Sequence, residues 1–398
     1  GMDVFDATDA SGAIHSVILT IEKIDALGAI RFATDDYITV VDAAANFKAL
    51  TAAQIDRFKT QGVDEIRVSA PDGATTIDNL ELTVALARSL AGIKFGETVV
   101  TNALGVVIAT SRDYLVDTAA HVQDLRGTEI AAFMQAGLDG ITLTDAGQQS
   151  LIFNVEQARG LNHVLSSSQM VNGVMTTTYT VDQKIVIPAA VNFTLVDSAA
   201  NIAGLSAREI GYLAANGFDS IDVNGDNNLS LAVDQYRALI ATTCKLNADD
   251  KITLSDTVDA LKGLSVQEIA ALATNGVDVI DVKAGGTSAL ELTVDQAKAL
   301  PRSVNGSEVT AKVVFGETKT VGVVGSSTDI QSLSVDEIKA LANAGVDFIN
   351  ATGASPITLA YEKAAVLGHI VVDGSDTLTV TCSTLELGAA NIAALKAN

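Results

Sequence analysis

The sequence predicts an α/β fold built as a repeat solenoid, in which short parallel strands and helices form a leucine-rich-repeat-like or β-helix-like coil. We expect about five to six units of about 70 residues. Three observations predict this fold. A phrase of the type G-x-D-x-I recurs, beginning at Gly62, Gly137, Gly217, Gly276 and Gly345. A leucine stands twelve residues before each glycine, at Leu50, Leu125, Leu205, Leu264 and Leu333. Helix-like and strand-like phrases alternate between these copies, and the lengths that join them vary.

The phrase after each leucine predicts a helix. In LSVQEI, Ser265 stands three residues before Glu268, which is the spacing of a capping box. The same spacing recurs in Thr51 with Gln54, Ser206 with Glu209, and Ser334 with Glu337. The second copy has Arg126 at the cap position, so we expect a weaker helix start there. Each helix should end at the glycine of the G-x-D-x-I phrase, because positive φ is common just past a helix end.

Short strands are expected after each of these helices. Val277, Ile280 and Val282 predict one strand, LEL from Leu290 predicts another, and VDQAKAL predicts a second helix. A further β-rich piece covers residues 312–324. This strand–helix–strand order favours parallel strands with helices outside, and its unbroken repetition favours a solenoid over a closed sheet.

The repeat phrases also predict the domain boundaries. We expect an N-terminal capping segment at 1–39 and a continuous array at 40–398. The expected units are 40–114, 115–194, 195–253, 254–322 and 323–384, with a partial unit at 385–398 that contains the phrase LELGAANIAAL. Residues 162–193 are polar and rich in Thr and Ser, and we interpret them as an insertion that forms a β-hairpin on one rim.

The composition limits the classes of partner. Hydrophobic residues make up 48% of the 398 residues, which is enough for a large core, and aromatic residues only 4%. The 25 Lys and Arg against 48 Asp and Glu give a formal charge of −23. Such a charge repels nucleic acid and anionic lipid, so we expect neither nucleic-acid binding nor membrane insertion. No apolar run reaches the roughly 18 residues of a membrane span.

One loop resembles the start of a calcium site. In DVNGDNNLS, Asp222, Asn224, Asp226 and Asn228 alternate as the first ligands of an EF-hand loop do. However, its sixth position is Asn227 rather than Gly, and its twelfth is Val233 rather than a bidentate carboxylate. A polar turn that bonds to itself is therefore the favoured interpretation, and a Ca²⁺ site is the alternative.

Two sets of polar positions recur with the repeat. The aspartates of the G-x-D-x-I phrase could bind cations, but we expect them to bond backbone N–H groups in the turn between helix and strand. They are Asp64, Asp139, Asp219, Asp278 and Asp347. A second position could form an interrupted asparagine ladder, and it holds Asn46, His121, Asn201, Ala260, Asp329 and Asn391.

The residues that usually carry catalysis are sparse. The four histidines, His15, His121, His163 and His369, stand alone, and no nucleophile, zinc or phosphate-loop motif appears. We therefore expect no enzyme and no cofactor other than the alternative Ca²⁺. Cys244 and Cys382 are expected to be small core residues rather than a disulfide.

The phrases LSVQEIAALATNGVDVIDV and LELTVDQAKAL resemble the repeats of very large acidic bacterial proteins, which are described as adhesins or hemolysin-type calcium-binding proteins. This resemblance covers most of residues 40–398 and implies export. It does not imply calcium binding, because the glycine–aspartate nonapeptides found in such proteins are absent here. Nor does it imply any catalytic residue.

We therefore expect an adhesive or spacer array at the cell surface or outside the cell, and a monomeric fragment. It would bind an unknown protein or glycan by multivalent contacts. One alternative is a calcium-stabilised structural module. Another is a carbohydrate-active enzyme on a coiled scaffold, which the scarcity of aromatic residues disfavours.

Overall fold

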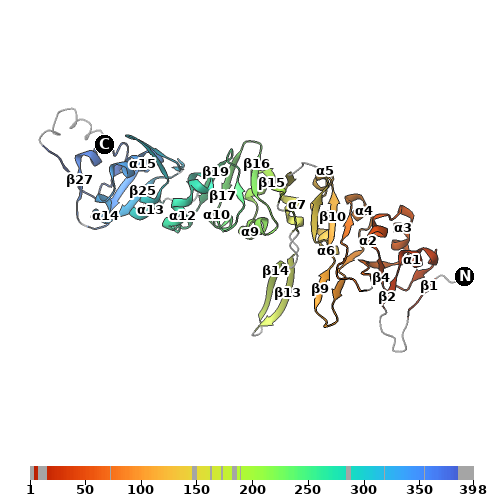
Figure 1. Cartoon of the computed structure of the whole chain (residues 1–398). Coiled ribbons are helices and arrows are strands. Elements are labelled where there is room, and N and C mark those ends of the chain that lie inside the picture. Colours follow the sequence, from red (N-terminus) through yellow and green to blue (C-terminus); the bar gives the residue numbers. More distant parts are fainter. Residues whose placement is uncertain are drawn as a thin grey trace. The chain divides into compact units, whose positions relative to one another are not determined.

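The computed structural model describes residues 4–7, 16–71, 73–145, 150–161, 164–171, 174–181, 186–188, 190–283, 288–317, 319–353 and 355–383. The chain divides into two compact units, Gly1–Val196 with Tyr212–Asp219, and Asp197–Gly211 with Ser220–Asn398. Short helices and strands alternate throughout (Figure 1). The predicted α/β class with parallel strands is confirmed. The sixth helical phrase, including Asn391, lies outside the described residues.

Each repeat begins with a strand and two short helices. The first strands are β4 (Tyr37–Asp42), β10 (Asp113–Asp117), β15 (Asn192–Ser198), β19 (Lys251–Asp256) and β25 (Val321–Gly325). The first helices are α2 (Ala44–Lys48), α5 (Ala119–Gln123), α8 (Ala199–Ala203), α11 (Val258–Lys262) and α14 (Ser327–Gln331). The second helices are α3 (Ala52–Gln61), α6 (Gly127–Ala136), α9 (Ala207–Ala215), α12 (Val266–Ala271), which η1 (Ala273–Asn275) extends, and α15 (Val335–Ala344).

Two more strands and a third helix follow. The second strands are β5 (Val63–Val68), β11 (Gly140–Leu143), β16 (Ser220–Asn224), β20 (Val277–Val282) and β26 (Phe348–Ala351). The third strands are β6 (Leu80–Leu82), β12 (Ser150–Phe153), β17 (Asn228–Leu231), β21 (Leu290–Thr293) and β27 (Ile357–Ala360). The third helices are α4 (Val84–Ser89), α7 (Val155–Gly160), α10 (Val233–Ile240), α13 (Val294–Ala299) and α16 (Tyr361–Ala364).

Fourth strands and hairpins complete the repeats. The fourth strands are β7 (Lys94–Gly96), β18 (Lys245–Leu246), β24 (Val314–Phe315) and β28 (Val371–Val372), and β29 (Leu378–Thr381) ends the described elements. The antiparallel hairpins are β8 (Val99–Thr101) with β9 (Val107–Thr110), β13 (Val164–Val171) with β14 (Val174–Val181), and β22 (Arg302–Asn305) with β23 (Glu308–Ala311). The hairpin predicted within 162–193 is thus present as β13 and β14.

The parallel sheets interlock successive repeats. In the sheet β6-β10-β11, strand β6 comes from the preceding repeat, and β10 and β11 from the next. The sheets β17-β19-β20-β24 and β21-β25-β26-β28 are built in the same way. A repeat therefore cannot complete its sheet alone, which follows from the short strands and the need to pair their backbone groups.

The N-terminal segment carries the same pattern. Strands β1 (Val4–Phe5) and β3 (Arg31–Phe32) pair in parallel, and β2 (Ser16–Leu19) joins the sheet β2-β4-β5-β7, with helix α1 (Ile21–Leu27) between β2 and β3. The segment at 1–39 thus supplies β2 to the next sheet, as later repeats supply their third strands.

The helix boundaries follow the predicted signals. The four capping boxes at Thr51, Ser206, Ser265 and Ser334 are present. All five glycines of the G-x-D-x-I phrase have positive φ, between 80° and 113°. At Arg126 no side chain caps the helix, but Glu129 still accepts the Arg126 N–H at 2.9 Å. Whether this helix start is weaker stays a prediction.

Candidate functional site

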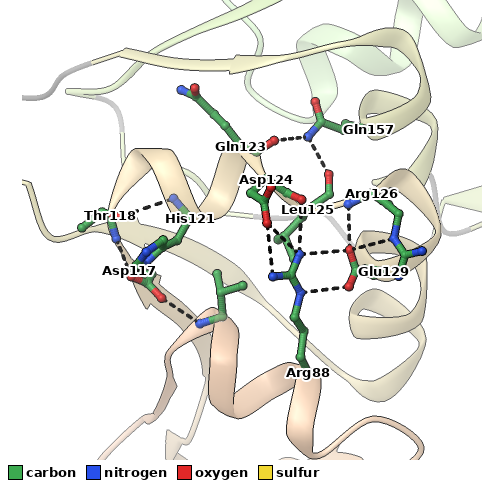
Figure 2. Close-up of polar contacts among 11 residues, drawn as sticks. Arg88, Asp117, Thr118, His121, Gln123, Asp124, Leu125, Arg126, Glu129 and Gln157 are labelled. Carbon is green, nitrogen blue, oxygen red and sulfur yellow. Dashed lines mark hydrogen bonds and ion pairs between the residues drawn. The ribbon is translucent and has the colours of Figure 1, made fainter.

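The corner between the first and second helices gathers polar contacts from neighbouring elements, and Figure 2 shows one such corner. At the corner between α5 and α6, Gln157 from α7 and Arg88 from α4 both point at the turn. The Gln157 amide donates to the carbonyls of Gln123 at 2.8 Å and Leu125 at 2.6 Å. Its Oε1 accepts the N–H of Asn154 at 2.9 Å. The carboxamide is thus fully bonded, as a buried polar group must be.

Two other repeats have the same arrangement. Gln235 donates to the carbonyls of Ala203 and Leu205 at 2.9 and 2.5 Å, and Gln296 donates to those of Lys262 and Leu264 at 3.0 and 2.7 Å. In each, Oε1 accepts the N–H of the residue three positions earlier. A glutamine therefore ties the third helix to the corner in three repeats. Sequence reasoning missed this role, although the Gln of VEQ, VDQ and VDQ marks it.

On each of two third helices, an arginine bonds the corner of the following repeat. Arg88 bonds Glu129 at 2.9 Å and Asp124 at 3.2 Å, and Arg237 bonds Glu268 at 2.6 Å. The hydrogen bond from Arg88 lowers the pKa of Glu129 to about 2, and Arg237 lowers that of Glu268 to about 2. These glutamates are capping-box residues, so the ion pair fixes a helix start.

Replacing Arg88 with leucine should therefore cost about 1 kcal/mol of unfolding free energy at pH 7. A carboxylate with a lowered pKa stabilises the fold above its unfolded pKa, and this contribution is lost as pH falls through the folded value. The difference between wild type and Arg88→Leu should thus shrink between pH 4.5 and about 2. Denaturant unfolding at several pH values measures it, with Lys59→Leu as an exposed control. A difference that does not change over this range would contradict the ion pair.

The aspartate that ends the first strand accepts hydrogen bonds from its own corner and from the third helix of the preceding repeat. The carboxylate of Asp117 accepts the N–H groups of Val84 and Thr118, at 2.9 and 2.8 Å, and His121 Nδ1 lies 2.7 Å from it (Figure 2). Burial alone would raise the pKa of Asp117, but the bonds from His121, Thr118 and Val84 lower it overall.

The predicted asparagine ladder is wrong, because this position pairs with the residue four places earlier. Asn46 donates to Asp42 at 2.6 Å and Asn201 donates to Asp197 at 2.7 Å. The fourth and fifth repeats differ. The Ala260 side chain cannot form a hydrogen bond. The residue four places before Asp329 is Gly325, so Asp329 accepts a hydrogen bond from the Ser326 hydroxyl instead. The pairs lie within one repeat, so they do not join repeats.

The aspartates of the G-x-D-x-I phrase each accept a backbone N–H, as predicted. Their partner, however, lies 26 residues earlier on the first strand and not in the adjacent turn. The donors are Ile38, Asp113, Phe193, Ile252 and Val321, at 2.7 to 2.9 Å. The carboxylate therefore continues the strand pairing where the second strand begins, which is a structural role.

Replacing one of these aspartates should weaken the fold measurably. Asp347→Ala leaves the N–H of Val321 without its acceptor, so we expect a loss of about 1–3 kcal/mol. Chemical denaturation measures this loss. The control is Asp336→Ala in the first turn of α15, which should change stability by less than about 0.5 kcal/mol. Equal losses for both variants would contradict this role.

The predicted calcium residues are divided between a strand and a turn. Asp222 lies within β16, and its carboxylate accepts the amide of Asn247 at 2.8 Å. The amide of Asn228 donates to the Asp226 carbonyl at 2.7 Å, and Asn227 has φ 53°. Asn224, at the end of β16, is exposed. The turn thus bonds to itself. Within the described residues, no group of three His, Cys, Asp or Glu could hold a metal ion.

One carboxylate occupies a position that is apolar in the other repeats. Asp113, at the start of β10, is 1% exposed, and Ile38, Phe193, Ile252 and Val321 hold the equivalent core position. Its Oδ2 has no hydrogen-bond partner among the described residues. Burial, together with the charges of Asp139, Glu97 and Glu65, raises the pKa of Asp113 to about 8. The carboxyl group is therefore largely protonated at neutral pH.

The cysteines and histidines add no site in the described residues. Cys244 is buried, as predicted, but Cys382 is exposed, so its predicted place in the core is wrong. His121 belongs to the Asp117 contacts, and His369 lies in the turn before β28. His15 and His163 lie outside the described residues.

No family model matches the chain, and no curated protein matches it significantly. In the described part of the chain, no helix is both long and apolar enough to cross a bilayer.

Proposed function

We propose that this chain is a non-catalytic structural and adhesive repeat region of a secreted or cell-surface bacterial protein, with its repeats stacked as one solenoid. The observation that carries the proposal is the recurrence of the same polar contacts from repeat to repeat. The recurring Asp, Gln and Asn side chains bond backbone groups or neighbouring structural side chains. We therefore assign these residues to the stability of the fold and not to catalysis.

The hairpins differ from repeat to repeat and are the elements we assign to binding. The hairpin of β8 and β9 exposes apolar side chains near its tip, where Leu104 is 86% exposed, and Val106 and Val107 are 55% and 56% exposed. Exposed apolar residues grouped on one element are typical of contact surfaces. Weak contacts of this kind gain strength when several are made at once.

Small-angle scattering tests the solenoid. With strands about 4.8 Å apart, two or three turns of the coil per unit give an array of about 60–70 Å. We expect the scattering of a rod of this order. A spherical particle, or units that tumble independently, would contradict the proposal.

Arrays of glycans and extracellular proteins test the adhesive role. The full chain should bind when it is displayed in many copies on a bead and far more weakly as a free monomer. Leu104→Ser with Val106→Ser should reduce binding, whereas Ile152→Ser, at an exposed strand position, should not. Turnover of a bound glycan would favour the enzyme alternative instead.

A calcium-stabilised module is the second candidate, and one observation near Asp222 favours it. Asp250 is 5% exposed and its Oδ1 has no partner among the described residues. Burial raises the pKa of Asp250, as do the charges of Asp222 and Asp249, and a bound cation would relieve both effects. Millimolar Ca²⁺ should then raise the melting temperature by several degrees, and Asp226→Ala should abolish the shift. An equal melting temperature in Ca²⁺ and in chelator would exclude this candidate.

A further inference from the structure

A groove of about 640 Å³ lies between α3 and α4 of the first repeat. Its lining combines apolar side chains with charged ones, and it includes Leu50, Ile55, Leu86, Thr83, Lys48 and Glu81. Lys48 and Glu81 form an ion pair of 2.6 Å there. The groove occupies the corner that corresponds to the one in Figure 2.

The residue that fills this corner elsewhere is missing from the first repeat. The helix position of Gln157, Gln235 and Gln296 is Leu86 in α4, and a leucine side chain has no N–H to donate. In the fifth repeat the position is Lys363, whose ammonium donates to the Gln331 carbonyl at 2.7 Å. The first repeat is therefore the one in which no side chain of the described residues reaches the corner carbonyls from this position.

At two positions beside the groove, the first repeat carries larger side chains than the second repeat. Ala52 and Ser89 stand where the second repeat has Gly127 and Gly160. A Cβ on Gly160 would lie 2.3 Å from the Gly127 carbonyl oxygen, so α6 and α7 pack closely only without side chains. The corner leucine of the first repeat is also less covered: Leu50 is half-buried, whereas Leu125, Leu205, Leu264 and Leu333 are at most 3% exposed.

The groove thus keeps the backbone groups that bind a carboxamide in three of the other repeats. There, the NH₂ of one glutamine donates to two corner carbonyls, and its oxygen accepts the N–H at the helix cap. The equivalent groups in the first repeat are the carbonyls of Lys48 and Leu50 and the N–H of Thr83. All three residues line the groove, together with apolar side chains that suit an aliphatic stem.

We propose that this groove binds the side-chain carboxamide of a glutamine or asparagine in another polypeptide. The NH₂ group of the incoming carboxamide donates to the carbonyls of Lys48 and Leu50, and the oxygen of the carboxamide accepts the Thr83 N–H. Leu50, Ile55 and Leu86 contact the side-chain methylenes. This inference stands apart from the array function, because it needs only the first repeat and its own corner.

Methyl-detected NMR of the full chain tests the proposal. The probe is N-acetyl-L-glutamine N-methylamide, and the control compound is N-acetyl-L-leucine N-methylamide, which lacks the carboxamide. We expect saturable shifts of the Leu50, Ile55 and Leu86 methyl groups with the glutamine compound, at a Kd of about 1 mM for so small a ligand. Binding of the leucine compound should be at least about tenfold weaker.

Substitutions at Leu86 provide the matched controls. Leu86→Gln should supply the missing carboxamide from within, raise the melting temperature, and reduce binding of the probe at least about tenfold. Leu86→Met keeps the groove apolar at this position and should still bind. The proposal is overturned if the leucine compound or a lysine analogue binds as tightly as the glutamine compound, if Leu86→Gln binds as well as wild type, or if no methyl group shifts. Scattering and bead assays are unaffected by these outcomes, so failure here leaves the array function standing.

Discussion

Asp113→Ile should stabilise the protein by at least about 2 kcal/mol at pH 7, and the gain should grow with pH. The equivalent residue in the other repeats is isoleucine, phenylalanine or valine, each at most 2% exposed, so the position accepts an apolar side chain. The substitution replaces a buried carboxyl group, one oxygen of which lacks a hydrogen-bond partner, with an apolar side chain that needs no partner. The backbone bond from residue 113 to Asp139 does not depend on the side chain and should persist.

The pH dependence follows from the raised pKa of Asp113. Between its unfolded value of 3.8 and about 8, the folded state holds a proton that the unfolded state releases. Unfolding therefore becomes easier as pH rises through this window, by up to about 1.4 kcal/mol per pH unit, and levels off above about 8. Urea denaturation of wild type and variant at pH 5, 6, 7 and 8, followed by tyrosine fluorescence, measures the difference.

Asp113→Asn separates charge from packing. It removes the titration, so the pH dependence should flatten as in Asp113→Ile, but the amide stays polar and buried and the gain should be smaller. If wild type and Asp113→Asn lose stability in parallel between pH 5 and 8, the carboxyl group does not hold its proton. The destabilising role of Asp113 would then be refuted.

Gln235→Leu should lower the unfolding free energy by about 2–4 kcal/mol, because it leaves two carbonyls and one N–H without their partner. Gln235 is 7% exposed and donates to the carbonyls of Ala203 and Leu205 while it accepts from Ala232. Water reaches this position poorly, so it cannot fully replace these bonds. Calorimetry or chemical denaturation measures the loss.

Gln267→Leu is the matched control, since it makes the same chemical change at an exposed position of α12. Its effect should be within about 0.5 kcal/mol. Gln235→Glu adds a second test. A carboxylate that faces two carbonyls should lower the unfolding free energy more at pH 7 than at pH 4, where it gains a proton. Similar losses at positions 235 and 267 would show that the bonds to the corner contribute little.

The local elements were predictable because their signals lie within a few residues. A hydroxyl three residues before a carboxylate predicts the starts of α12 and α15, and a glycine where φ must be positive predicts the end of α15. The strand at Val277 and the helix at Val294 follow from alternation and from polar helix-cap residues. These features depend on backbone conformation and on neighbours in the chain, so the sequence contains them directly.

The partners of the recurring polar residues were less predictable. Asp64 and its equivalents were expected to bond backbone, yet the donor lies 26 residues away. Asn46 was a candidate for an asparagine ladder but bonds Asp42 within its own repeat. The groove beside Leu86 exists because the first repeat lacks the glutamine that three other repeats have at this position. This difference becomes visible only when the corners of several repeats are compared.

The sequence by itself determined that short strands and capped helices recur along the chain, because periodicity, caps and glycines act locally. Only the tertiary structure decided which strands pair, since a parallel strand finds its neighbour across a helix whose length does not specify the register. The same holds for the buried Asp113 and the open corner at Leu86. Burial and hydrogen-bond partners are set by residues that are distant in the chain and close in space.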